Sequence, residues 1–275
     1  MKFRGFVGAA AMWACVGLAG DSQAGTFGSI FLTGHDPDFH AFAGGNLTGA
    51  RRINQVAISF VMDPAFNPYV AGGINRFLFV ESSISPPGGH VDGEQGIIMS
   101  GYTPGVDYDR VPASGLNAAL DQLGTTYSAI VVASDFGGIL TQGELDILNA
   151  RAVDIADFVN SGGGLYAMAE SNSGAHLTPN GGHFAFVPTI TAAVSLDQSE
   201  VGFTVSPFGA SLGLTDADVN GNASHNFFQQ LGGLQPVDFD AAGRVMSAAG
   251  RVFIPGPGGL VMMCVGAGLA VRRRR

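Results

Sequence analysis

Cysteine is almost missing from this sequence of 275 residues. Its two cysteines, Cys15 and Cys264, lie in apolar segments near the two ends of the chain. The body between them therefore offers no disulfide, no zinc–thiolate site and no cysteine nucleophile.

Charge is also scarce, and positive charge most of all. Charged residues make up 13% of the chain, against about 25% in an average protein. The net charge is −9, and Lys2 is the sole lysine. An acidic body repels phosphate backbones, so we expect no nucleic-acid partner.

Residues 1–24 have the three parts of a secretory signal peptide. Lys2 and Arg4 are basic, residues 5–20 are apolar, and Ser22-Gln23-Ala24 is a small-x-small cleavage site. The alternative, a buried first helix, lacks the polar face that such a helix needs. We therefore expect signal peptidase and the export machinery to process this segment.

Residues 251–275 combine a Pro-Gly segment, an apolar run and an arginine cluster. The run from Val252 to Val271 is near the minimum length for a membrane helix, and basic residues after it stay on the cytoplasmic side. The segment resembles the PEP-CTERM sorting signal, although Gly256 stands where that motif has Glu. The matching residues are Ile254, Pro255, Gly256 and Pro257, followed by Arg272, Arg273, Arg274 and Arg275.

The sorting-signal resemblance implies a location and a partner. Such a protein is exported across the inner membrane of a Gram-negative bacterium and handled by an exosortase-like processing enzyme. It is then held at the membrane, in the cell envelope, or released to the surface or extracellular matrix.

The body alternates apolar strands with amphipathic helices, which is typical of a doubly wound parallel sheet. We expect strands at Phe27–Thr33, Arg76–Ser82, Tyr127–Ala133 and Leu165–Ala169, and helices at Leu47–Val61, Ser114–Leu123 and Thr141–Asn160. Thr141 and Glu144 form a capping box at the start of the last helix. This helix should connect the last two strands as parallel neighbours.

The C-terminal part is expected to be richer in strands. Short β elements are predicted at Phe184–Val187, Thr191–Ser195 and Gly202–Val205, a short helix at Ser224–Leu231, and a hairpin turning at residues 241–243. The predicted fold is α/β, flavodoxin-like and doubly wound, with a β-rich C-terminal part and apolar helices at both ends.

Residues 25–250 resemble the class I glutamine amidotransferase-like fold, through the stretch "YSAIVVASDFGG…VNSGGGLYAMAESN". That family places a cysteine just after the strand that follows the triple glycine, and pairs it with a His-x-Glu motif. Here Glu170 occupies the turn, and His225 has no Glu two residues later. The resemblance therefore implies the fold without glutamine hydrolysis.

Polar residues follow the predicted strands, at the edge where open parallel sheets bind ligands. His35, Asp36, Asp38 and His40 follow the first strand and are candidate ligands for a divalent metal. Glu170 and His225 are candidate acid–base residues that should lie beside them. The alternative is that Asp36 and Asp38 cap turns around Pro37 and that the histidines lie at the surface.

A second candidate is a calcium-like loop at residues 216–227. Asp216, Asp218, Asn220 and Asn222 alternate around Gly221, but Phe227 stands where a calcium loop ends in Glu. The alternative is a loop built on Asx turns.

Two functions remain open from the sequence. One is an exported, envelope-anchored or surface-released protein with a non-catalytic binding or structural role. The other is a metal- or carboxylate-dependent hydrolase on the same scaffold.

Overall fold

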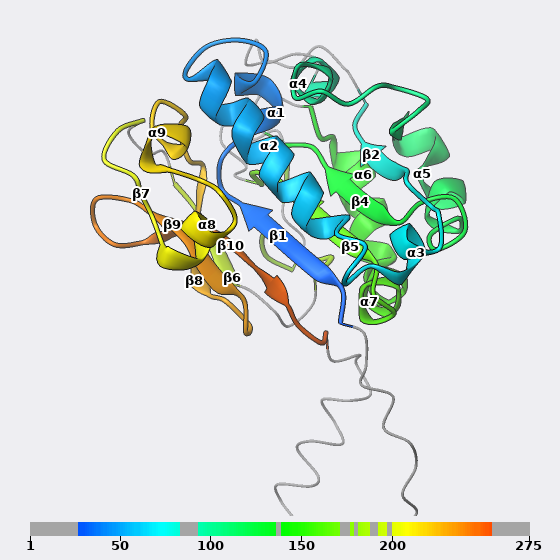
Figure 1. Ribbon diagram of the computed structural model, residues 1–275. Coiled ribbons are helices and arrows are strands. Elements are labelled where there is room, and N and C mark those ends of the chain that lie inside the picture. The colour runs from blue at the N-terminus through cyan, green and yellow to red at the C-terminus, as the bar shows by residue number, and fades with distance from the viewer. Residues whose placement is uncertain are drawn as a thin grey trace, which may run out of the picture.

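The computed structural model describes residues 27–82, 93–135, 139–170, 177–178, 181–187, 192–196 and 200–254 (Figure 1). The predicted signal peptide (residues 1–24) and residues 255–275 of the predicted sorting signal lie outside these residues. Within them, no helix is long and apolar enough to cross a membrane.

Five parallel strands form one half of a ten-stranded sheet. They are β1 (Ser29–Thr33), β2 (Phe77–Val80), β3 (Tyr108–Val111), β4 (Ala129–Val132) and β5 (Gly164–Ala167), arranged in the order β3-β2-β4-β5-β1. The predicted parallel pairing of β4 with β5 is confirmed. The order differs from the 2-1-3-4-5 order of flavodoxin, because here the first strand pairs with the fifth.

Antiparallel strands complete the sheet beyond β1. The strand β10 (Val245–Arg251) pairs with β1 on one side and with β9 (Gln235–Phe239) on the other. Beyond the end of β1, β10 also pairs with β8 (Asn226–Gln230), which in turn pairs with β6 (Ala192–Ser195); β7 (Thr204–Val205) pairs with β9. The predicted strand-rich C-terminal part is thus an extension of the same sheet.

Helices cover both faces of the parallel strands (Figure 1). One face carries α2 (Leu47–Val61) and α4 (Gly93–Met99), and the other carries α5 (Ala113–Leu120), α6 (Gln142–Ala150) and α7 (Ala152–Asn160). The bounds of α2 are those predicted, since apolar residues recur every three or four positions along it and the Asn46 side chain caps its first turn. The shorter helices are α1 (Pro37–His40), α3 (Pro68–Ala71), α8 (Pro207–Ser211) and α9 (Asp216–Val219).

Three sequence predictions need correction. The expected helix Thr141–Asn160 begins with its predicted capping box but is divided into α6 and α7 at Arg151, whose ψ of 15° is not helical. The Arg151 side chain there bonds Asp121 and Asp154. The expected helix at 224–231 is the strand β8, because β6 and β10 pair with it.

The third correction is the expected strand Phe184–Val187, which forms turns. The edge strand β3 was not predicted, since "YDRV" contains two charged residues in four.

Both ends of the described body are tied to the C-terminal end of α7, at the lower end of Figure 1. The Gly28 N–H donates to the Val159 carbonyl, 2.8 Å away. The Asn160 side chain bonds both the N–H and the carbonyl of Ile254, each at 2.8 Å. Ile254, the first residue of the predicted sorting motif, is therefore a buried part of the body.

Candidate functional site

The loops after β1 and β5 meet the start of β8 at the carboxyl edge of the parallel strands, the upper end in Figure 1. The Ala169 N–H donates to the His35 carbonyl at 3.0 Å, and the His225 N–H donates to the Gly34 carbonyl at 2.6 Å. Predicted site residues from three distant parts of the chain are thereby placed in adjoining segments.

Asp36, His40 and His225 form an imidazole–carboxylate cluster at this edge. The Asp36 carboxylate is fully buried, with His40 Nε2 3.4 Å from one oxygen and His225 Nε2 3.4 Å from the other. His40 reaches Asp36 because it lies four residues later on α1, whereas His225 comes from the segment before β8. Both separations lie within ion-pair distance, but they are longer than the roughly 2.6–3.2 Å that direct proton transfer requires.

His35 is held in a separate buried pair. Its Nε2 lies 2.8 Å from Asp238 on β9, and its Nδ1 lies 3.0 Å from the Ala223 carbonyl. Burial lowers the pKa of His35, but the charge and hydrogen bond of Asp238 outweigh it, so that the pKa is raised. Both ring nitrogens face acceptors, which is the arrangement of a protonated, structural imidazolium.

Asp38 connects α1 with the end of β4. One of its carboxylate oxygens accepts the Ser134 N–H at 2.8 Å, and the other accepts the Phe39 N–H at 3.0 Å. Burial raises the pKa of Asp38 to about 6, and the nearby charge of Asp36 adds to the increase. Gly93, at the start of α4, packs closely against this carboxylate.

Glu170 is bound to its surroundings through both its backbone and its side chain. The Asn226 amide group bonds the Glu170 N–H and carbonyl at 2.8 and 2.7 Å, so β8 holds the turn after β5. One carboxyl oxygen accepts the Phe184 N–H at 2.8 Å. Burial raises the pKa of Glu170 well above its usual range, and the charge of Asp135 raises it further.

The turn held by Glu170 brings together a serine and a histidine that the sequence did not reveal. Phe184 has a φ of 58°, in the left-handed region that non-glycine residues rarely adopt. The preceding residue, His183, lies with Nε2 2.9 Å from the Oγ of Ser195, at the exposed end of β6. Burial lowers the pKa of His183, which favours the neutral ring.

No sequence signal pointed to this Ser195–His183 pair. The two residues lie twelve positions apart in no recognised motif, and only Gly181-Gly182 marks the tight turn before the histidine.

The four candidate metal ligands after β1 have different partners in the structure. His35 pairs with Asp238, Asp38 binds backbone N–H groups, and Asp36 lies against His40. In the described ranges, no group of three or more His, Cys, Asp or Glu side chains is arranged to hold a metal ion.

The residues of the calcium-like loop bond backbone groups. Asp216 and Asp218 lie in α9, where Asp218 forms a capping box with Thr215 and Asp216 accepts the Val205 N–H at 2.7 Å. The Asn220 side chain bonds the 202–203 backbone, and the Asn222 side chain bonds Asn46. These contacts are those of caps and turns.

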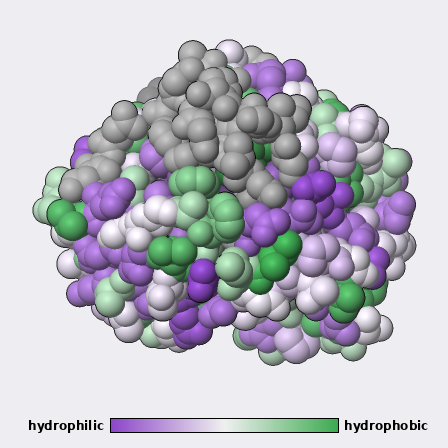
Figure 2. Space-filling model, turned by 90° about the horizontal axis from the view of Figure 1, so that it is seen from above, coloured by the Kyte–Doolittle hydropathy of each residue, from purple (hydrophilic) through white to green (hydrophobic). Residues whose placement is uncertain are grey.

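Viewed from the carboxyl edge, the described surface mixes hydrophilic and hydrophobic residues without one extended apolar area (Figure 2). A hollow of about 330 Å³ lies elsewhere, between α2 and α8, and none of its lining residues belongs to the groups described above.

Comparison with known proteins finds no significant match. No protein-family model matches this chain, and neither a curated protein nor a solved structure gives a significant match. The function is therefore inferred from the geometry of the site and from the two terminal segments.

Proposed function

We propose that this protein is exported to the cell envelope of a Gram-negative bacterium and is either anchored there or released to the surface. The signal-peptide pattern of residues 1–24 and the sorting-signal pattern of residues 251–275 support this proposal. Ile254 is buried, and its backbone is hydrogen-bonded to the Asn160 side chain. Processing near Pro255–Pro257 would leave these contacts of Ile254 in place.

We further propose that the body is a non-catalytic relative of the class I glutamine amidotransferases that binds a ligand or partner, such as a matrix polysaccharide, at its carboxyl edge. The state of Glu170 carries this proposal. In the resembled family this turn holds the nucleophile, which must be accessible and ionised. Here the residue is buried, its pKa is raised, and its carboxyl group accepts the N–H of Phe184. A neutral acid in that position stabilises a turn and does not attack a substrate.

The test of export uses the full chain expressed in a Gram-negative host. Cell fractions and mass spectra of the purified protein should show a new N-terminus near Gly25. A cytoplasmic protein that retains residues 1–24 would contradict the proposal of export.

The test of the non-catalytic role compares the wild type with Glu170→Gln. We expect neither protein to release ammonia from glutamine above the buffer rate, and we expect both to bind matrix polysaccharide equally. Glutamine hydrolysis that disappears in Glu170→Gln would show that the family reaction survives in an altered form.

A hydrolase remains the second candidate, and the Ser195–His183 pair is the observation that favours it. A neutral imidazole 2.9 Å from an exposed hydroxyl can accept the serine proton as the oxygen attacks an ester carbonyl. The acyl-serine would form as the alcohol leaves with that proton, and water would then release the acid.

A fluorophosphonate probe tests this second candidate directly. Covalent labelling that is lost in Ser195→Ala would establish the serine as a nucleophile. It should persist in the control Ser211→Ala, since Ser211 is an exposed serine that bonds only the Phe208 carbonyl of its own helix. Absence of labelling in the wild type would exclude this candidate.

A further inference from the structure

Three aromatic side chains stand exposed near the two ends of the described part of the chain. Phe27, Phe66 and Phe253 are 43%, 44% and 52% exposed, which is unusual for side chains of this size. The rings of Phe27 and Phe253 meet edge to face with centroids 6.1 Å apart. We call these three residues the terminal aromatic face.

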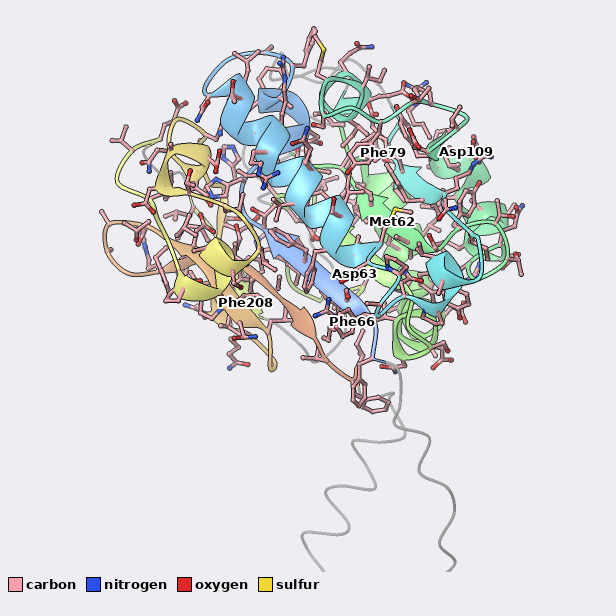
Figure 3. All side chains as sticks on the ribbon, in the orientation of Figure 1. Met62, Asp63, Phe66, Phe79, Asp109 and Phe208 are labelled. Carbon is pink, nitrogen blue, oxygen red and sulfur yellow. The ribbon has the colours of Figure 1, made fainter. Side chains whose placement is uncertain are left out.

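Phe66 contacts Arg251, which lies two residues before Phe253. The Arg251 guanidinium lies 3.4 Å above the centre of the Phe66 ring. Figure 3 labels Phe66 and Asp63 at this lower end of the body, beside the start of β1. Asp63 lies 3.4 Å from Arg251, so the charge on this face is paired.

The position of the chain limits what can cover this face. Asn160 fixes Ile254 to the body, and the apolar run of the sorting signal begins at Leu260. Six residues span at most roughly 20 Å when fully extended. Because Ile254 is buried in the body, the predicted membrane run cannot begin at Val252, and a tail that enters the bilayer by its apolar core at residues 260–271 keeps Phe253 within about that distance of the bilayer surface.

From this placement we infer that the terminal aromatic face docks on the surface of the membrane in which the tail is anchored. This inference rests on the proposed anchoring. Aromatic side chains bind the boundary between headgroups and acyl chains by burying apolar area there. The chain as a whole is acidic, with a net charge of −9, and its body would not approach an anionic bilayer by itself. The short connection supplies a high effective concentration that replaces electrostatic attraction.

The native sequence makes this docking easy to measure, because Trp13 is its sole tryptophan. The full chain with Trp13→Phe and Phe253→Trp carries one fluorescent reporter on the terminal aromatic face. Reconstituted into vesicles of phosphatidylethanolamine and phosphatidylglycerol, it should emit at shorter wavelength than in detergent. Lipids brominated in their acyl chains should remove most of its intensity.

Phe42 provides the matched control. It is 40% exposed but follows α1 at the carboxyl edge, the opposite end of the body. The variant with Trp13→Phe and Phe42→Trp should keep its emission and should not be quenched by brominated lipids. Equal quenching of both reporters would contradict a defined docking face.

A further variant separates docking from simple proximity. When Phe27→Ser and Phe66→Ser are added to the Phe253→Trp reporter, quenching should fall, because two of the three contacts are gone. Unchanged quenching would show that the connection alone brings residue 253 to the bilayer, and would overturn the inference.

Flotation of the vesicles distinguishes the two levels of the proposal. Protein that floats with the vesicles while its Phe253→Trp reporter stays unquenched is anchored but not docked. Protein that does not float at all refutes both the anchoring and the docking.

Discussion

Replacing Asp38 with asparagine should change how stability depends on pH. The Asp38 carboxylate is fully buried and accepts two backbone N–H groups, those of Phe39 and Ser134. Asparagine has the same shape and no charge, but only one oxygen. The substitution therefore removes the cost of a buried charge and also leaves one backbone donor facing an amide NH₂ group.

The size of this change in stability with pH follows from the pKa of Asp38, which burial raises from 3.8 to about 6. Between these two pH values the unfolded chain loses its proton while the folded chain keeps it, so stability falls as the pH rises. A pKa raised from 3.8 to about 6 corresponds to a loss of about 3 kcal/mol, at about 1.4 kcal/mol for each pH unit. The loss is complete above about pH 6 and absent below pH 3.8.

Asp38→Asn carries no charge, so its stability does not fall with pH in this way. It does leave one backbone N–H without an acceptor, which lowers the free energy of unfolding by about 1–3 kcal/mol. Near pH 4 the variant should therefore be less stable than the wild type by about that amount. At pH 7 the two effects nearly cancel, or the variant is slightly more stable. The difference between the two proteins should change by about 3 kcal/mol over this range.

Urea unfolding from pH 4 to pH 8, followed by circular dichroism, measures this difference. Asp146→Asn is the control, because it removes an exposed carboxylate from α6. Titration of the other carboxylates is common to both proteins and cancels in the comparison. If the stabilities of wild type and Asp38→Asn ran parallel across the whole range, the assignment of a buried, raised-pKa carboxyl group to Asp38 would be wrong.

Three further predictions concern other parts of the site. Asp238→Ala should lower the free energy of unfolding by about 3–5 kcal/mol in a urea titration near pH 6, because it leaves the His35 imidazolium buried without its partner. Since the pKa of His35 is raised, this loss of stability should become smaller as the pH rises through that pKa. A loss that stays constant with pH would exclude the charged pair. Gly96→Ala should lower the melting temperature, at a cost of about 1–3 kcal/mol, because the new Cβ would overlap the carbonyl oxygen of Asp38, and an unchanged melting temperature would contradict this packing. Asp216→Ala should lower the free energy of unfolding by about 1 kcal/mol, and by the same amount in calcium and in chelator, because the Asp216 carboxylate accepts a backbone N–H. A larger loss of stability in calcium would favour the calcium loop.

Local patterns predicted the parallel half of the sheet well and its extension less well. The strand β4 is a run of apolar residues buried on both faces, and α2 has a cap and a regular apolar face. Both elements can therefore be predicted from a few neighbouring residues. The strand β8 is different, because its conformation is set by pairing with β6 and β10, at distant positions in the chain. The break at Arg151 also has no local signal in the sequence; there the Arg151 side chain bonds Asp121, thirty residues earlier on another segment.

The location of the candidate site followed from topology, whereas its pairings did not. The rule that parallel strands share one carboxyl edge placed Asp36 and Glu170 in adjoining segments. It did not place His225, which precedes the antiparallel strand β8. It could not reveal that His35 would pair with Asp238, 203 residues away, because that contact depends on the antiparallel strands packed beyond β1. Ser195 was hidden for the same reason, since it meets His183 only through the pairing of β6 with β8.

The place of β10 has a consequence for how the chain can be made. Ser29 pairs with Arg251, so a strand synthesised near the start is enclosed by one synthesised near the end. Such distant pairing makes for slow folding. A chain that stops before Val245 would lack β10, and one side of the apolar strand β1 would become an open edge. Open apolar edges recruit other chains. Fragments of this protein should therefore aggregate, and the nascent chain must be kept from doing so until its last strand has been synthesised.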